Sequence, residues 1–220
     1  MKISIVMPVL NEAELIADRL AQLKASLSGD YEIIVVDGGS LDATVECAQT
    51  DADSVISSAR GRALQMNAGA ARAQGDVFVF LHADTSLPAN AIDVLSGVNG
   101  GWGRFNVRLS GEHFMFRMIE RMMNLMSCLT AVATGDQAMF VSRDLFEKVH
   151  GFPEIDLMED IALSKRLRKY MKPLCLRQRV TTSSRRWQQH GIIKTILLMW
   201  WLRLLYFIGV SPSRLAQIYR

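Results

Sequence analysis

Residues 33–40 read IIVVDGGS, and this stretch decides the fold class. Its four branched apolar residues predict a strand that is buried on both faces, and Asp-Gly-Gly ends that strand in a turn. Similar apolar runs lie at residues 3–9 and 77–81. Segments with helical spacing separate the runs, at about residues 15–23, 43–50 and 61–74. We therefore predict an α/β fold, in which helices cover both faces of a mostly parallel central sheet.

Polar side chains follow the predicted strands at their carboxyl ends, namely Asn11 and Glu12, then Asp37, then His82 and Asp84. Ligands of open α/β sheets bind at this edge. A carboxylate there can accept hydrogen bonds from a nucleotide, or it can hold Mg²⁺ or Mn²⁺, which prefer oxygen ligands and bridge phosphates. A later acidic pair, Glu159-Asp160, can supply a general base. The pattern favours a phosphate-bearing ligand and a proton-transfer step.

The composition is typical of one globular domain. The chain has 220 residues, of which 50% are hydrophobic and 21% charged, which excludes intrinsic disorder and leaves enough apolar material for a core. Its three cysteines, Cys47, Cys128 and Cys175, are far apart and form no Cys-x-x-Cys pair. This spacing argues against a zinc site, and it predicts reduced thiols in a cytoplasmic protein.

The net charge of +3 conceals an asymmetry along the chain. Residues 1–160 contain all 22 Asp and Glu but only 12 of the 25 Lys and Arg, a net charge of −10. Residues 161–220 contain the other 13 basic side chains and no acidic one, a net charge of +13. Such a segment favours an anionic partner, a phosphate or an anionic lipid surface, although it can also serve only solubility. Nucleic acid is disfavoured, because no RNA-binding motif interleaves the cations with aromatic residues.

Residues 192–210 form the most apolar segment of the chain. The segment is almost as long as the about 20 residues that a helix needs to cross a bilayer. Arg203 lies inside the segment, however, and placing its charge in the bilayer core costs free energy. Its aromatic residues favour a membrane–water boundary, namely Trp200, Trp201 and Tyr206. We expect a domain over residues 1–190 and a helical extension over residues 191–220. The extension docks either on a second subunit, giving a homodimer, or peripherally on a membrane.

Residues 113–126 carry five of the twelve methionines at helical spacing. Methionine is flexible and polarisable, so a helix rich in it either fills a core or lines an adaptable apolar groove. Both alternatives stay open at the level of the sequence. In the second, the groove would accept a lipid or another acceptor.

Five motifs occur together in an order and spacing that is specific to one enzyme family. They are VMPVLNE at residues 6–12, VVDGGSLD at 35–42, RGRALQMNAGAARAQGD at 60–76, FLHAD at 80–84, and MED at 158–160 followed by RLR at 166–168. Through them the sequence resembles the family 2 glycosyltransferases, which have the GT-A fold, from Ile3 to about Trp187. Within the family it looks similar to small bacterial members that are called radical-SAM/selenodomain-associated transferases.

The resemblance implies a nucleotide-diphosphate sugar, a UDP- or GDP-sugar, as the donor. By their positions in the motifs, Pro8, Asn11 and Glu12 would shape the nucleotide pocket. Asp37 would contact the base or the ribose, and Arg62 would contact the base or a phosphate.

The resemblance also implies the reaction, transfer of the sugar to an acceptor hydroxyl. Asp84 would bind Mg²⁺ or Mn²⁺, Asp160 would be the catalytic base, and Glu159 would orient that base or contact the acceptor. Asp136 lies where the family has its sugar-facing loop and would bind a sugar hydroxyl. Activation of the acceptor by Asp160 for a single displacement implies inversion at the anomeric carbon. The acceptor itself is unidentified, and a lipid-linked hydroxyl suits the basic C-terminal segment.

The sequence departs from the family pattern at three places. Gly38 and His82 each stand where the family usually has an aspartate, which leaves Asp84 as the main protein ligand. His82 would be a hydrogen-bonding wall of the site, with ligation of the metal as the alternative. Residues 183–187 read SSRRW and resemble the Q-x-x-R-W motif of processive synthases without its glutamine. Arg186 would still face the leaving diphosphate and Trp187 would stack on the acceptor; a surface arginine and a core tryptophan are the alternative.

Two other enzyme classes are excluded at the turn after the first strand. Residues 8–12, PVLNE, lack both the basic Gly-rich loop of a nucleotidyltransferase and the Gly-x-Gly-x-x-Gly of a dinucleotide oxidoreductase. A third reading stays open, because the changes at Gly38 and His82 also suit a catalytically degenerate domain that binds a nucleotide or a partner. The expected location is cytoplasmic, at the inner face of the membrane if the extension binds lipid.

Overall fold

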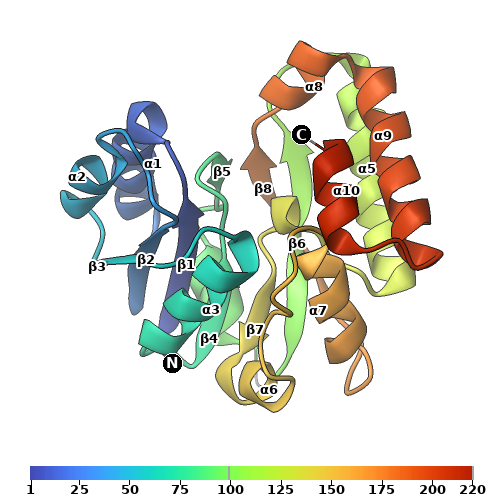
Figure 1. Ribbon diagram of the computed structural model, residues 1–220. Coiled ribbons are helices and arrows are strands. Elements are labelled where there is room, and N and C mark those ends of the chain that lie inside the picture. Colours follow the sequence, from blue (N-terminus) through green and yellow to red (C-terminus); the bar gives the residue numbers. More distant parts are fainter. Residues whose placement is uncertain (99, 220) are drawn as a thin grey trace.

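The computed structural model describes residues 1–98 and 100–219, in which an eight-stranded sheet is covered by helices (Figure 1). The strand order is β3-β2-β1-β4-β7-β6-β8-β5. The strands are β1 (Ile3–Val9), β2 (Tyr31–Asp37), β3 (Ser54–Ser57), β4 (Val77–Phe80), β5 (Thr85–Ser86), β6 (Trp102–Leu109), β7 (Phe140–Ser142) and β8 (Leu174–Thr182). The helices are α1 (Ala13–Ser26), α2 (Thr44–Gln49), α3 (Arg62–Arg72), α4 (Ala91–Ser96), α5 (Phe114–Thr130), the 3₁₀ helix η1 (Gly135–Gln137), α6 (Arg143–Lys148), α7 (Glu159–Leu167), α8 (Arg185–His190), α9 (Ile192–Phe207) and α10 (Pro212–Tyr219).

Strands β1 to β4 form the parallel half of the sheet. β1 lies between β2 and β4, so that Val6 is opposite Ile34 on one side and Phe80 on the other. β3 extends this half by pairing with β2. The α/β fold and the predicted strands at residues 3–9, 33–36 and 77–81 are confirmed in this half.

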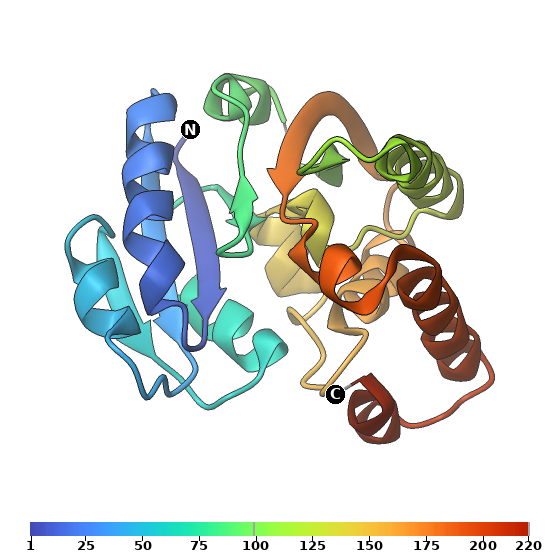
Figure 2. The same ribbon diagram turned by 90° about the horizontal axis from the view of Figure 1, so that it is seen from above.

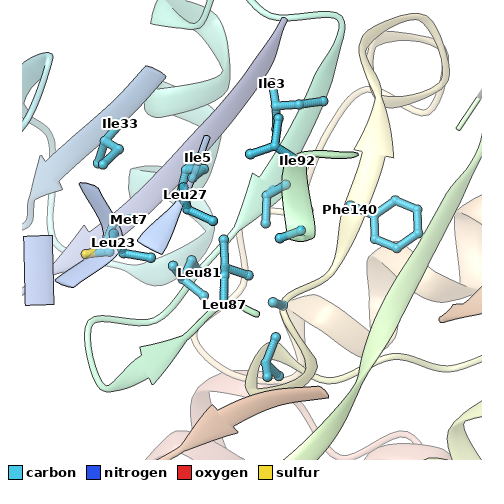
Figure 3. Packing of buried hydrophobic residues seen from close by; sticks show 14 of the residues in the cluster. Ile3, Ile5, Met7, Leu23, Leu27, Ile33, Leu81, Leu87, Ile92 and Phe140 are labelled. Atoms are coloured by element: carbon cyan, nitrogen blue, oxygen red, sulfur yellow. The ribbon is translucent and has the colours of Figure 1, made fainter. Parts of the chain in front are cut away.

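The alternation of side chains along β1 divides the core between the two faces of the sheet. Ile5 and Met7 point to the face that α1 covers, where they pack with Leu23 (Figure 3). Val6 points to the opposite face, which α3 covers. α3 can approach β1 closely because it has glycine at position 69: a Cβ there would lie 2.3 Å from Cγ1 of Val6.

The second half of the sheet is mixed. β7 runs antiparallel to both β4 and β6, β6 is parallel to β8, and β5 closes the edge antiparallel to β8. Four of the seven strand pairs are therefore parallel, three of them in the first half. β8 was not predicted, because its arginines at positions 177 and 179 break the apolar runs that mark the other strands.

The C-terminal helices pack on the rest of the chain along two seams. Ile192 and Ile196 of α9 contact α5, beside which α9 lies in Figures 1 and 2. On its other side, Leu202 of α9 and Leu215 of α10 are fully buried against Met158 and Ile161 at the start of α7. The predicted boundary at residue 190 stays a prediction. None of the helices in residues 1–98 and 100–219 is long and apolar enough to cross a membrane.

Two of the three cysteines form a disulfide. Cys128 near the end of α5 is bonded to Cys175 of β8, with their Cα atoms 6.0 Å apart. The prediction of reduced thiols was wrong for this pair, and it holds for Cys47, which is free. The two residues are 47 positions apart in the sequence, so only the packing of the second half of the chain brings them together.

Candidate active site

The parallel register brings the loops after β1, β2 and β4 to one edge, called the donor edge here. Val9 at the end of β1 is opposite Asp37 at the end of β2, and the loop of residues 81–85 follows β4 beside them. Pro8 is half-buried just before the end of β1. The sheet therefore collects the residues that were predicted to bind the donor.

The loops after β1 and β2 are joined by hydrogen bonds that Asn11 and Asp37 make to the backbone. Asn11 has a left-handed backbone, with φ of 53°, and its Oδ1 accepts a hydrogen bond from Leu41 N at 2.8 Å. The N–H of Asn11 donates to Oγ of Ser40 at 2.9 Å. Buried Asp37 accepts from the N–H groups of Gly39 and Ser40, at 2.9 and 3.1 Å. Both residues thus fix the shape of the donor edge.

Gln65, which was not predicted, completes this edge and accounts for Gly38. Its side-chain amide is buried and donates to the backbone oxygens of Val9 and Val36, at 2.8 Å each. A Cβ on residue 38 would lie 3.0 Å from that amide. Glycine therefore takes the place of the usual aspartate where Gln65 needs the space. The sequence signal was a polar residue in a helical segment of small and apolar neighbours.

Glu12 and Asp84 form an acidic group that faces Arg185. Partial burial raises the pKa of Glu12, and the carboxylates of Asp84 and Asp42 raise it too, while Arg185 opposes them. Arg185, at the start of α8, was not predicted. The neighbouring Arg186 was predicted to face the diphosphate, but its side chain lies outside the described part of the chain.

Asp84 offers one carboxylate that could bind a metal ion. It is half-buried, and Oδ1 accepts a hydrogen bond from Oγ1 of Thr85 at 3.2 Å. Among the described residues, no three His, Cys, Asp or Glu side chains gather closely enough to hold a metal ion by themselves. One carboxylate still fits Mg²⁺ or Mn²⁺, because such ions commonly take the rest of their oxygen ligands from substrate phosphates and water.

Glu159 and Asp160 lie in the first turn of α7. Asp160 is half-buried; its Oδ2 accepts from Gly135 N at 3.0 Å and its Oδ1 from Ile161 N at 2.7 Å. Burial raises the pKa of Asp160 against these hydrogen bonds. Glu159 is buried, and Arg62 Nη1 lies 3.9 Å from its Oε1. Burial and the Asp160 charge raise the pKa of Glu159, against the attraction of Arg62.

His82 connects the donor edge to these carboxylates. Its Nδ1 lies 3.7 Å from Oδ1 of Asp136, in η1. Its ring also packs on Gly135, where an added Cβ would lie 2.5 Å from Nε2. Gly135 in turn donates its N–H to Asp160. Through these contacts, His82 forms part of the wall of the site and links the loop of Asp84 to the loop of Asp136.

The C-terminal helices also reach the carboxylates, which was not predicted. The charge of Arg203 in α9 lowers the pKa of Asp160, in opposition to burial. Burial raises the pKa of Tyr206, one turn further along α9, and the charge of Asp160 adds to the rise. Arg203 lies within electrostatic range of Asp160 because α9 packs on the start of α7.

Trp187 lies apart from this group. It is half-buried in α8 and packs against the cluster of Leu109, Phe116 and Ile119. The alternative of a tryptophan in the hydrophobic core describes this position well. A stacking contact with the acceptor stays a prediction for the exposed part of the ring.

Comparison with known sequences identifies the class of the N-terminal region. Residues 4–96 match the family described as glycosyl transferase family 2. Dolichol-phosphate mannosyltransferase from Pyrococcus furiosus is 35% identical over 102 residues, which cover 43% of this chain and 29% of the relative. Undecaprenyl-phosphate 4-deoxy-4-formamido-L-arabinose transferase from Pseudomonas fluorescens is 34% identical over 102 residues, which cover 41% and 30%. The chain thus spans less than a third of the length of these relatives.

Solved structures of glycosyltransferases share the fold at low sequence identity. A mannosyltransferase from Pyrobaculum calidifontis, solved with GDP-Man and Mn²⁺, is 20% identical with a TM-score of 0.68, over 99% of this chain and 68% of that one. Glucosyl-3-phosphoglycerate synthase from Mycobacterium tuberculosis, solved with Mn²⁺, UDP and glucosyl-3-phosphoglycerate, is 20% identical with a TM-score of 0.58, over 83% and 70%.

The fold and the motifs together define the class. The predicted GT-A fold is confirmed by these structural likenesses. Residues 4–96 are similar to family 2 glycosyltransferases, and the whole chain shares the fold of the solved glycosyltransferases.

Proposed function

We propose that this chain is a glycosyltransferase that moves a sugar from a UDP- or GDP-sugar to an acceptor hydroxyl, with inversion and with help from Mg²⁺ or Mn²⁺. The arrangement around Asp160 carries the proposal. A half-buried carboxylate with a raised pKa is held by two backbone N–H groups, and Gly135 and His82 connect it to the loop of Asp84. A proton acceptor and a metal ligand on adjoining loops are what a metal-assisted transfer of this kind needs.

The donor would bind along the donor edge. Pro8, Asn11 and Glu12 line the turn after β1, Asp37 contacts the base or the ribose, and Arg62 contacts the base or a phosphate. Asp84 would hold the divalent metal, which, when bound, neutralises charge on the diphosphate. Arg185 faces the same acidic group and supplies a cation for the leaving diphosphate in the role predicted for Arg186. Asp136, next to His82, accepts a hydrogen bond from a sugar hydroxyl.

Asp160 accepts the proton of the acceptor hydroxyl. The acceptor oxygen attacks the anomeric carbon while the bond from that carbon to the diphosphate oxygen breaks. The bonding pair leaves with the nucleoside diphosphate, and the proton ends on Asp160. Glu159, held by Arg62, orients the base. Attack opposite to the leaving group gives inversion.

We further propose a lipid-linked acceptor and a location at the cytoplasmic face of a membrane. Two similar proteins carry dolichol-phosphate and undecaprenyl-phosphate in their names, and both of these are membrane lipids. The basic segment of residues 161–220 suits an anionic surface. The radical-SAM/selenodomain-associated subtype is proposed on the likeness of the sequence to small bacterial members of the family.

The experiment that tests the function is a transfer assay. Purified protein is incubated with UDP- and GDP-sugars and Mn²⁺ or EDTA, and the release of nucleoside diphosphate is measured. A thermal-shift series with UDP and GDP reports binding separately. Metal-dependent release that is lost in Asp160→Asn supports the transferase. Nucleotide binding without release from any donor in the presence of a membrane-lipid extract favours the degenerate domain, the alternative that Gly38 and His82 suggest.

A further inference from the structure

Helix α9 exposes an uninterrupted apolar face. Seven large side chains on α9 and the residue after it are between 52% and 68% exposed, namely Ile193, Leu197, Trp200, Trp201, Leu204, Phe207 and Ile208. At 100° per residue these positions project from one side of the helix, while Leu202 on the opposite side is buried. The apolar character of residues 192–210 therefore exceeds what the core of this chain uses.

Helix α5 continues this face. Six of its large apolar side chains are between 39% and 74% exposed, namely Phe114, Met118, Met122, Leu125, Met126 and Leu129. Its inner side packs with Ile192 and Ile196 of α9. The two helices lie side by side (Figures 1 and 2), and we take their exposed stripes to form one face. These thirteen residues are called the α5/α9 face. They make up most of the nineteen large apolar side chains that are exposed in the described part of the chain.

The border of the α5/α9 face carries cations. Arg121 and Lys194 are exposed on the two helices themselves. Nζ of Lys165 lies 4.5 Å from the ring centroid of Phe207. Nη1 of Arg168 donates to the backbone oxygen of Thr130 at 3.2 Å, beside Leu129.

Exposed acidic side chains are absent from both helices. Glu120 is the one acidic residue of α5; it is buried and ion-paired with Arg117 at 2.8 Å. The sequence of α9 contains no Asp or Glu. The α5/α9 face is therefore apolar in its middle, and the cations at its border outnumber Glu112, the exposed acidic residue just before α5.

This charge pattern decides between the two possible occupants of the face. In a dimer, two copies of the face would bring cations against cations, with no exposed carboxylate on either helix to pair with them. An anionic bilayer offers phosphates to the cations and an interfacial layer to the tryptophans. We propose that the α5/α9 face docks on the surface of a bilayer that contains anionic phospholipid.

Docking in this way places the candidate active site at the lipid surface. The same helix that presents Trp200 and Leu204 outward brings Arg203 within electrostatic range of Asp160. The membrane contact deepens the proposed membrane location by naming the surface that makes it, and it depends on the face alone and not on the sugar or on turnover. It can therefore be tested with a protein that is catalytically silent.

The test is flotation of the full chain with vesicles of phosphatidylcholine alone or with about one third phosphatidylglycerol. We expect binding to the anionic vesicles that weakens as salt is added, because exposed charges are screened. Leu197→Gln, in the middle of the face, should lower the partition constant by about fivefold or more, since burying one leucine on an interface contributes on the order of 1 kcal/mol. The matched control is Leu41→Gln, which removes a leucine that is 95% exposed but lies at the donor edge.

A second pair of variants tests the border. Arg121→Gln with Lys194→Gln should weaken binding about fivefold for each cation, whereas Arg72→Gln with Lys148→Gln, on α3 and α6, should leave it unchanged. Light scattering on the same protein variants, without vesicles, reports their oligomeric state. The proposal is overturned if the folded wild-type chain does not float with anionic vesicles, or if Leu197→Gln converts a dimer to a monomer without changing flotation.

Discussion

The donor edge and the C-terminal helices differ in whether their side chains find partners within the described chain. At the donor edge, Asn11, Asp37 and Gln65 hold the loops after β1 and β2 with hydrogen bonds to the backbone. In α9 and the residue after it, by contrast, seven large apolar side chains are more than half exposed. The donor edge is therefore preorganised for its ligand, whereas the C-terminal helices are complete only with a further surface. Under the two proposals, the first region would recognise the donor and the second would locate the protein at a membrane.

The largest effect is expected at Asp84. Asp84→Ala removes the one carboxylate proposed to hold the metal, so transfer should be abolished and Mn²⁺ should no longer tighten the binding of UDP or GDP. Titration calorimetry with and without Mn²⁺ measures this, with Asp93→Ala, an exposed aspartate of α4, as the control. Mn²⁺-dependent tightening of the nucleotide that persists in Asp84→Ala would move the metal site to another residue.

The next effect concerns the base. Asp160→Asn keeps the size of the side chain but cannot accept a proton, so turnover should fall by roughly 10²–10⁴-fold while the donor binds as before. Initial rates at saturating donor measure the loss, and Asp156→Asn, an exposed neighbour, is the control. A fall of less than about tenfold would direct the search for the base to Glu159.

A third prediction tests whether the donor edge is held as described. Gln65→Leu keeps a large side chain but removes the donor to the backbone oxygens of Val9 and Val36. Because a buried acceptor that loses its partner is costly, the free energy of unfolding should fall by about 1–3 kcal/mol. Urea unfolding measures this against Gln49→Leu, an exposed glutamine of α2. Equal stability of the two variants would show that the amide does not hold the edge.

The two regions also differ in how far the sequence could predict them. Strands β1, β2 and β4 and the polar residues after them follow from local runs, because a buried parallel strand and the turn that ends it are short-range features. Gln65, Arg185 and the pair Cys128–Cys175 could not be found in this way. Their partners come from distant segments, so only tertiary packing reveals them.

Arg203 is the sharpest example of this limit. Its place inside an apolar segment argued against a membrane span, and no helix among the described residues is long and apolar enough for one. The proximity of Arg203 to Asp160 could not be inferred from the sequence, because α7 and α9 are separated by β8 and α8. The prediction that the surrounding helix meets a further surface stays a prediction.

The smallest effect is a shift in pH dependence that links the two regions. Burial raises the pKa of Asp160, and Arg203 opposes this rise. Transfer requires the deprotonated carboxylate, so activity should be lost as the pH falls through this raised pKa. Arg203→Gln removes the opposing charge and should raise the pKa of Asp160 further. The acid limb of the kcat profile should then move to higher pH by a fraction of a unit to about one unit, while the rate on the alkaline plateau stays near that of the wild type. Arg214→Gln, an exposed cation of α10, should leave the limb in place. Equal acid limbs for Arg203→Gln and Arg214→Gln would mean that α9 locates the enzyme without tuning its base.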